Sequence, residues 1–163
     1  FFWFYPRSLK IEDKTKRMVG SSEIIISIPK GTDFDEVSME VDAGEVLIDA
    51  LNAREFSAEI GGGRLSVSGV LSATEIDCSV GAGQIEVQKL SGSDIELECG
   101  AGQVKVVLDG SQEDYYLEGK CVGEIKFGTE SYGSIGKKIS EGTGSKNINV
   151  ECGVGQINIQ FAK

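Results

Sequence analysis

The stretch Val80-Gly-Ala-Gly-Gln-Ile-Glu-Val87 decides the fold, because close copies of it recur along the chain. The shared glycine falls at positions 44, 63, 83, 102, 123 and 155, so successive copies are 19, 20, 19, 21 and 32 residues apart. Self-similarity at a period of about 20 residues is typical of solenoid proteins. The copies are Val41–Ile48, Ile60–Val67, Val80–Val87, Cys99–Val106, Lys120–Phe127 and Cys152–Ile159.

Apolar and polar residues alternate on both sides of each glycine. In one copy, acidic residues separate Ile95, Leu97 and Cys99, and a lysine separates Val104 from Val106. A period of two is typical of half-buried strands, so each copy contributes two short strands joined at a corner. A unit of this size cannot bury its apolar face alone. We therefore predict an all-β solenoid, similar to a β-helix or β-roll, with about six coils of roughly 20 residues and two main strands per coil.

Stacking in register would align equivalent residues of successive coils into columns. The residue before the shared glycine is small in the first four copies, as a tight inward bend requires. The glycine itself needs either a positive φ or close passage of another backbone. Apolar residues at matching offsets predict a second corner in each coil, at Leu51, Val70, Leu90 and Leu108. The predicted inward columns are Val41, Ile60, Val80 and Cys99; Val46, Leu65, Ile85 and Val104; and Ile48, Val67, Val87 and Val106. The small corner column is Ala43, Gly62, Ala82 and Ala101.

Both ends of the array depart from the repeat. Four isoleucines between Ile24 and Ile28 predict an opening strand. The fifth copy is displaced by one residue ahead of Lys120, which indicates a bulge. The Gly- and Ser-rich segment 129–145 predicts a surface excursion or an irregular coil. Because the last copy runs to Phe161, we expect that coil to end the stack and to expose an unpaired edge.

The chain divides into two predicted segments. We assign residues 1–22 to an N-terminal strand or a segment next to a membrane anchor, and residues 23–163 to the solenoid domain. The chain begins with Phe1-Phe-Trp-Phe-Tyr-Pro6 and without methionine, which indicates a piece of a longer protein and leaves room for an anchor upstream. The alternation of Leu9 and Ile11 favours the strand. No apolar run reaches the length of about 18 residues that a transmembrane helix needs.

The composition argues against several classes of function. A formal net charge of −10 at pH 7 disfavours binding to nucleic acid or to anionic membranes. The absence of histidine removes the commonest general base and metal ligand. Cys78, Cys99, Cys121 and Cys152 lack the spacing of a zinc site, and two of them replace isoleucine or valine of sister copies. We therefore expect buried, unpaired thiols rather than a disulfide framework.

A column of outward acidic residues is the best candidate site. It consists of Glu40, Glu59, Glu98 and Glu151, with Ser79 interposed, and Asp77 and Glu96 are expected beside it. Carboxylates one strand apart repel one another and could bind divalent cations weakly. The alternative is a solvated face that keeps a β-rich protein soluble. Because that alternative is the simpler one, we assign no catalytic residue, no cofactor site and no metal ligand.

Three other motifs resemble sites but lack the residues that would complete them. The Gly-Ala-Gly turns lack the Gly-Lys-Ser/Thr sequence and the helix of a phosphate loop. Gly61-Gly-Gly-Arg-Leu-Ser66 lacks the aspartate of a calcium-binding β-roll. Lys105 and Lys126 lie near Glu86 and Glu124, but a polysaccharide-cleaving β-helix needs its acids gathered in a groove.

The order of the elements also carries a resemblance. An isoleucine-rich segment ending in Ile28-Pro29 is followed by an Asp33-Phe34 link, the Gly-x-Gly copies and an Ile-x-Ile-x-Phe tail from Ile157 to Phe161. This order, from Glu23 to Phe161, resembles the DUF4097 family, bacterial β-strand-repeat proteins described as adhesins. The resemblance implies a β-solenoid on a bacterial protein, often attached to a membrane-anchoring or regulatory segment. It offers no catalytic residues, and the displaced fifth copy departs from the family pattern.

We therefore expect a non-catalytic module of the bacterial cell envelope or surface. It would be an adhesin or binding domain that presents a rigid acidic surface to a protein, glycan or wall partner, and not to nucleic acid. Two alternatives stay open, a structural or regulatory scaffold that self-associates through its terminal coil and a glycan-active β-helix enzyme. A cytoplasmic location also stays open, because the four cysteines are expected to be unpaired.

Overall fold

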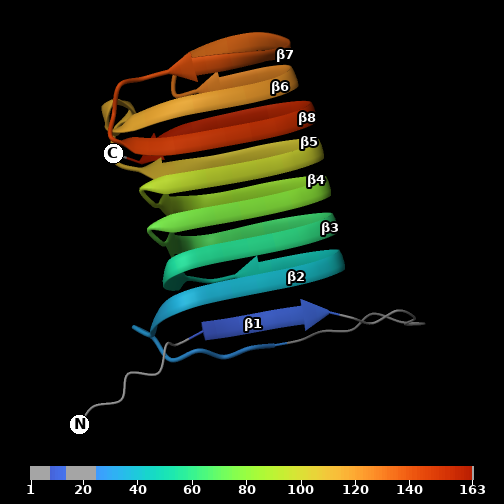
Figure 1. The fold of residues 1–163 in the computed structure, drawn as a ribbon, viewed down its shortest axis with the longest axis vertical. Helices are drawn as coiled ribbons and strands as arrows, with labels where there is room; N and C mark the ends of the chain where they lie inside the picture. The colour runs from blue at the N-terminus through green and yellow to red at the C-terminus, as the bar shows by residue number, and fades with distance from the viewer. Residues whose placement is uncertain (1–7, 14–24, 163) are drawn as a thin grey trace.

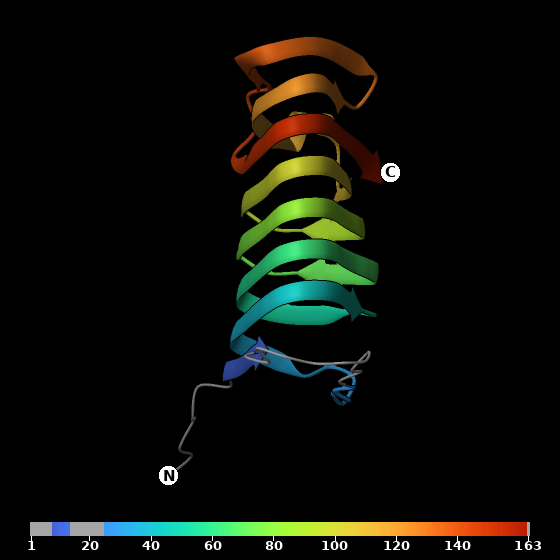
Figure 2. The same cartoon turned by 90° about the vertical axis from the view of Figure 1, so that its right-hand side faces the viewer.

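The computed structural model describes residues 8–13 and 25–162, which form one stack of β-strand coils (Figures 1 and 2). Within these two ranges, no helix is long and apolar enough to cross a membrane. The strands are β1 Ser8–Asp13, β2 Asp33–Ile48, β3 Leu51–Ser72, β4 Glu75–Ser91, β5 Asp94–Asp109, β6 Tyr115–Phe127, β7 Glu130–Glu141 and β8 Lys146–Ala162, with a 3₁₀ turn η1 Gln112–Asp114 before β6.

Successive coils pair in parallel and in register. Val41 of β2 pairs with Ile60 of β3, Ile60 with Val80 of β4, and Val80 with Cys99 of β5. The shared glycines pair with one another at the same steps. The predicted all-β solenoid is therefore confirmed. The two strands expected in each coil are the two halves of one long strand bent at the glycine, which we call the first leg (before the glycine) and the second leg (after it) (Figure 1).

Two columns of glycine build the corner between the legs. In the shared column φ lies between +134° and +152°, a region that favours glycine. A Cβ atom on Gly83 would lie 1.7 Å from the carbonyl oxygen of Gly63, and one on Gly102 would lie 1.8 Å from that of Gly83. Two residues before Gly83, a Cβ atom on Gly81 would lie 2.4 Å from the carbonyl oxygen of Gly61. Adjacent backbones therefore approach more closely at the corner than any side chain would allow.

The inward residues of the two legs meet in one continuous core. The inward residues of both legs on β3, β4 and β5 follow the predicted columns and are at most 2% exposed. Val41 and Val46 are only half-buried, because β2 lies near the N-terminal end of the stack. The members buried on β3 to β5 are Ile60, Val80, Cys99, Leu65, Ile85, Val104, Val67, Val87 and Val106.

The small residues of the corner column were predicted to be required by a tight inward bend, and this prediction is wrong. Ala43, Ala82 and Ala101 are exposed. On β8 the same column holds Val154, whose side chain is 63% exposed. The corner bends so that this position points away from the core, and packing therefore does not restrict its size.

The second corner also differs from the prediction at one residue. Leu71, which is fully buried, pairs with Leu90, and Leu90 pairs with Leu108. Val70 had been predicted at this position but pairs with Lys89 and is 37% exposed. The register between β3 and β4 shifts after Val67, so β3 holds one residue more than β4 before the corner.

The strand that ends the chain does not end the stack. β8 lies between β5 and β6 and pairs in parallel with both, so the order in the sheet is β1-β2-β3-β4-β5-β8-β6-β7 (Figures 1 and 2). The prediction that the coil ending at Phe161 terminates the stack with an unpaired edge is therefore wrong. After β5 the chain passes over one level of the stack, and β8 fills that level later.

The loop 110–114, which connects β5 to β6 past the level that β8 occupies, is stabilised by internal polar contacts. The Asp114 carboxylate accepts hydrogen bonds from the backbone N–H of Ser111 at 2.8 Å and from its hydroxyl at 3.2 Å. These hydrogen bonds lower the pKa of Asp114, so the carboxylate stays charged at neutral pH. The loop is therefore a defined crossover rather than an open connection.

An aromatic cluster joins β6 to β8. The Tyr115 ring is fully buried, and its hydroxyl donates a hydrogen bond to the carbonyl oxygen of Asp109 at 2.8 Å. Desolvation raises the pKa of Tyr115 to about 12, so the hydroxyl keeps the proton that it donates. The Phe161 ring lies 5.9 Å from the Tyr115 ring and 5.1 Å, edge on, from the Phe127 ring, between centroids. These contacts join the end of β8 to the start and end of β6.

β7 turns back over the far end of the stack and runs antiparallel to β6. The segment 129–145, predicted to be a surface excursion or an irregular coil, thus contains the strand that follows β6 in the stack. The bulge expected in the fifth copy is present as a register shift between Cys121 and Val122 of β6 against β8. Tyr132 and Ile139 of β7 pack on the core, and the Tyr132 hydroxyl donates to Glu141 Oε2 at 3.2 Å. β7 therefore places a partly polar cap over the core.

The opening strand predicted at residues 24–28 is not present in its described part. Residues 25–28 are not assigned to a strand, and the Ile25 and Ile26 side chains are 78% and 46% exposed. The first leg of β2 pairs instead with β1, where Leu9 and Ile11 alternate as expected. Because β1 occupies that edge, the isoleucines have no place on it. Ile24 and the aromatic run Phe1–Pro6 lie outside the described residues.

Replacing Val87 by Asp should destabilise the protein severely. The Val87 side chain is 1% exposed and lies between equivalent valines of β3 and β5, so a carboxylate there would be buried without a partner. We expect a loss of about 4 kcal/mol in the free energy of unfolding, measured by urea denaturation. The control Gln88→Asp changes the exposed neighbour and should stay within about 0.5 kcal/mol of wild type. Melting of Val87→Asp like the wild type would contradict the inward assignment.

Replacing Gly102 by Ala should disrupt the corner. The new Cβ atom would meet the Gly83 carbonyl oxygen at 1.8 Å, and the φ of +144° disfavours any side chain. We expect a loss of at least about 2 kcal/mol by urea denaturation. Gly133→Ala is the matched control, because nothing lies within 4 Å of its Cβ position. Equal stability of the two variants would show that the corner backbones are not in contact.

Candidate functional site

The outward residues of the first legs form one continuous acidic surface. Each of the strands β2 to β5 has three outward positions on this leg, and the register places each one beside its equivalents on neighbouring strands. All of these positions hold Glu, Asp or Ser, so the surface combines carboxylates with small hydroxyls. We call it the acidic face, and it consists of Glu36, Ser38, Glu40, Glu55, Ser57, Glu59, Glu75, Asp77, Ser79, Asp94, Glu96 and Glu98.

The structure brings the predicted site residues together. Glu40, Glu59, Ser79, Glu98 and Glu151 form one outward column, and Asp77 pairs with Glu96 in the column beside it. The sequence prediction missed a third acidic column, Glu36, Glu55, Glu75 and Asp94. Its residues stand two and four positions before members of the other two columns. The same period of two could therefore have identified them.

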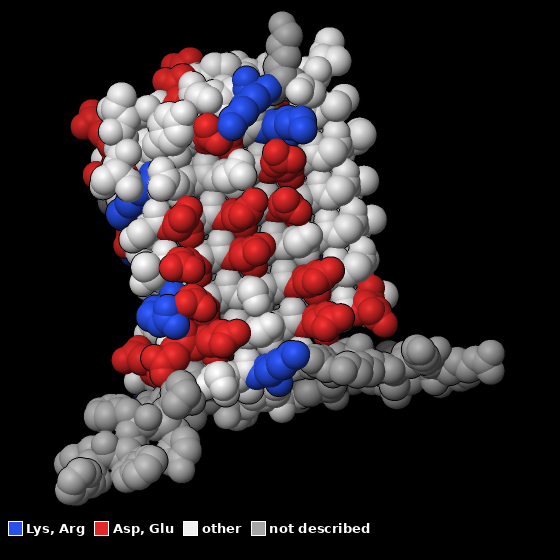
Figure 3. Space-filling model, viewed as in Figure 1, with Lys and Arg blue, Asp and Glu red and all other residues white. Residues whose placement is uncertain are grey.

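The excess of acidic residues is confined to the lower and middle strands (Figure 3). On β8 the equivalent positions hold Asn147, Asn149 and Glu151. On β6 and β7, Lys120 lies 4.0 Å from Glu151, and Lys138 lies 2.7 Å from Glu118. On β6, β7 and β8, lysines therefore neutralise acidic side chains of the first legs. The three columns of the acidic face on β2 to β5 contain no lysine or arginine. Arg54, which lies on β3 next to Glu55 and outside the three columns, forms an ion pair with Glu55.

The acidic face is open rather than enclosed. Two depressions run between its columns. Ser57, Asp77 and Glu96 line both of them, and Lys10 of β1 lies at the edge of one. Among residues 8–13 and 25–162, no group of three or more acidic or cysteine side chains is arranged to hold a metal ion. The face therefore offers an extended charged surface for contact.

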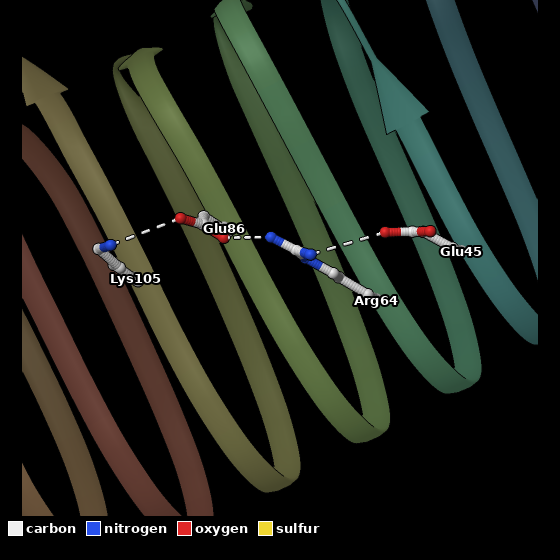
Figure 4. Close-up of polar contacts among 4 residues, drawn as sticks. All are labelled: Glu45, Arg64, Glu86 and Lys105. Atoms are coloured by element: carbon white, nitrogen blue, oxygen red, sulfur yellow. Dashed lines mark hydrogen bonds and ion pairs between the residues drawn. The ribbon is translucent and has the colours of Figure 1, made fainter.

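The second legs carry charges of both signs that are paired across strands. Arg64 of β3 forms ion pairs with Glu45 of β2, at 3.7 Å, and with Glu86 of β4. Glu86 also accepts a hydrogen bond from Lys105 Nζ of β5 at 3.4 Å. The four side chains follow one another across four coils (Figure 4). This face therefore balances its own charge, in contrast to the acidic face.

Glu86 is the central group of this ion-pair chain. Its side chain is only 16% exposed and lies between two cations. The hydrogen bond from Arg64 is the main cause that lowers the pKa of the Glu86 carboxyl. The hydrogen bond from Lys105 and the positive charges of both side chains lower it further, against the opposing effect of desolvation. The expected proximity of Lys105 to Glu86 is confirmed, and the contribution of Arg64 was missed.

The cysteines are free and buried, as expected. Desolvation raises the pKa of the Cys78 thiol far above its usual range, and that of Cys121 to about 11. It also raises the pKa of Cys99 and of Cys152. Since only a thiolate is a strong nucleophile, these side chains are unreactive while they stay buried.

Comparison with known proteins adds one match. The family model described as Toastrack DUF4097 matches residues 7–154, which run from β1 to the glycine corner of β8. No curated protein and no solved structure matches the chain. The match covers most of the chain and includes the first five copies of the repeat and the start of the sixth, so it concerns the architecture as a whole.

Replacing Glu86 by Gln should cost about 1 kcal/mol at pH 7, because the ion-pair chain loses its central charge. The folded-state pKa of Glu86 is lowered, so its contribution is present above the unfolded pKa of about 4.3 and is lost as the pH falls through the folded value. Urea denaturation at neutral and acidic pH should therefore show the difference from wild type shrinking in acid. A difference that is independent of pH would contradict this role, and Glu113→Gln, which changes an exposed acid, serves as control.

Proposed function

The chain belongs to the Toastrack DUF4097 family, and we propose that it is a non-catalytic binding module of the bacterial cell envelope. In this proposal the acidic face docks onto a positively charged surface of a partner protein. The envelope location follows from what the family resemblance implies, and the docking surface follows from the distribution of charge. The chain would act as an adhesin or as the binding domain of a larger envelope protein.

The segregation of charge is the observation that carries the proposal. Nine of the twelve positions of the acidic face are carboxylates, and the other three are Ser38, Ser57 and Ser79. The second legs of the same coils balance Glu45 and Glu86 with Arg64 and Lys105. A general need for solubility would not distinguish the two faces of one coil. The difference supports a specific use of the first-leg face.

In-register stacking brings the carboxylates of the acidic face close together, and their mutual repulsion destabilises the isolated protein. Strands lie about 4.8 Å apart, and two unit charges at about 5 Å in water repel by about 0.8 kcal/mol before salt screening. A partner that brings positive charge to the columns would relieve this repulsion in every coil at once. Such electrostatic complementarity mainly speeds association and selects the partner, and both effects weaken as ionic strength rises.

The rigidity of the face suits recognition by surface complementarity. The carboxylates of β2 to β5 stand on strands whose backbones are paired on both sides. A partner therefore meets charges at fixed spacings and loses little entropy in ordering the module itself. Solenoid proteins commonly bind through extended surfaces of this kind.

The two alternatives, a self-associating scaffold and a glycan-active enzyme, each require particular structural features. A scaffold that stacks end to end would have to use β7 at the C-terminal end, because β8 is paired on both sides. Over the core, that end presents Tyr132 hydrogen-bonded to Glu141. A glycan-active enzyme would need acids with separate roles in a groove, whereas the carboxylates of the acidic face are repeated from coil to coil.

Binding to immobilised polylysine tests the proposal directly. We expect the triple variant Glu59→Gln, Asp77→Asn, Glu96→Gln to lower affinity about tenfold, which corresponds to about 1.4 kcal/mol. The control Asp49→Asn, Glu113→Gln, Glu130→Gln removes the same charge from other exposed positions and should keep near-wild-type affinity. Binding of the wild type should weaken as salt increases.

An equal loss of affinity in both triple variants would show that net charge alone drives binding, and it would overturn the assignment to the acidic face. Absence of polylysine binding by the wild type at low salt would overturn the proposal itself. Sedimentation at high concentration distinguishes the binding module from the scaffold alternative, because only the scaffold requires the isolated protein to self-associate.

A further inference from the structure

Three of the four cysteines stand on adjacent levels of one inward column. Cys99 of β5 pairs with Cys152 of β8, and Cys152 pairs with Cys121 of β6. Adjacent strands place such partners about 4.8 Å apart, within the range of about 4.4–6.8 Å between Cα atoms that disulfides span. Cys152 therefore has a cysteine neighbour on each side. Cys78 lies in a different column, between Ala58 and Leu97.

The three thiols share one environment beside the glycine corner. Cys99 Sγ lies 3.7 Å from the carbonyl oxygen of Gly83, and Cys152 Sγ lies 3.8 Å from that of Gly102. Cys121 Sγ lies 3.4 Å from the carbonyl oxygen of Gly155. Each thiol thus donates to the corner of a neighbouring level.

Packing alone does not require sulfur in this column. The three earlier levels hold Val41, Ile60 and Val80 at the same position. Cysteine replaces them only on β8, which is inserted out of chain order, and on the two strands that flank it, β5 and β6. The thiols therefore coincide with the one place where a strand is inserted between two others.

We propose that Cys152 forms a disulfide with Cys99 or with Cys121 when the chain folds in the presence of a small-molecule disulfide, which fastens β8 covalently between β5 and β6. One cysteine thiolate attacks the oxidant and releases one thiol, leaving a mixed disulfide. The second cysteine thiolate attacks the protein sulfur of that mixed disulfide and releases the second thiol. Two protein thiols are oxidised and one oxidant disulfide is reduced to two thiols.

The disulfide forms while β8 is being inserted during folding, and not after the protein has folded. In the finished stack Cys99, Cys121 and Cys152 are at most 2% exposed, so an oxidant has no access to them. Burial also disfavours the thiolate that must attack. Because Cys152 is shared, the two disulfides exclude each other. The remaining thiol can exchange with the bond, which leaves one disulfide in either position.

Refolding with glutathione tests the proposal. Reduced, unfolded full-length chain is refolded in a mixture of oxidised and reduced glutathione, and free thiols are counted after removal of the glutathione. We expect two of the four thiols to be lost, with a peptide map linking Cys152 to Cys99 or Cys121. The urea midpoint of the oxidised protein should rise and return to the reduced value on addition of reductant. The natively folded, reduced protein should keep all four thiols over the same period.

Two variants test whether the disulfide forms specifically within the column of Cys99, Cys152 and Cys121. Cys152→Val should fold, because Val80 fills the same position on β4, and it should keep its three remaining thiols free. Cys78→Ala should still form the disulfide, since Ala58 fills its position on β3. A folded wild type that keeps four free thiols, a link that involves Cys78, or oxidation of Cys152→Val to the same extent as wild type would each overturn the proposal.

Discussion

Contact between backbones at the glycine corner is the constraint on which the rest of the structure depends. A Cβ atom at Gly63, Gly83, Gly102 or Gly155 would lie within 1.8 Å of the carbonyl oxygen on the neighbouring level. A shift of one residue would bring a side chain into that contact, so the corner opposes such a slip in register. The corner therefore aligns the inward aliphatic columns and the outward charged columns together.

This alignment has opposite consequences for the two faces. Like residues of successive copies come to lie side by side, so a repeated acid becomes a column of mutual repulsion, as in Glu36, Glu55 and Glu75. On the second legs the copies have diverged, and Arg64 and Lys105 alternate with acids to give attraction instead. One register thus produces a balanced face and an unbalanced one. The unbalanced face is where a partner of opposite charge gains most.

Much of the fold and of the candidate site could be predicted from the spacing of residues. The period of the glycines identifies the corners, and the alternation around Val87 and Glu96 assigns the core and the acidic columns. The order of the last strands could not be predicted, because β6 and β8 both carry the repeat and either could pair with β5. What separates them is non-local, namely the crossover closed by Asp114 and the packing of Phe161 on Tyr115 and Phe127. The isoleucines before Pro29 misled the prediction because β-propensity does not reveal that β1 already occupies the edge.

The distance between spin labels on the exposed corner column tests the central claim most directly. Ala101, Val154 and Val122 are exposed corner residues on β5, β8 and β6, so labels there should not disturb the core. In-register stacking with β8 inserted places Ala101 one level from Val154 and two levels from Val122, about 5 Å and about 10 Å between Cα atoms. Dipolar broadening should therefore be stronger for the 101–154 pair than for the 101–122 pair. The reverse order, or labels too far apart to interact in both pairs, would contradict the account.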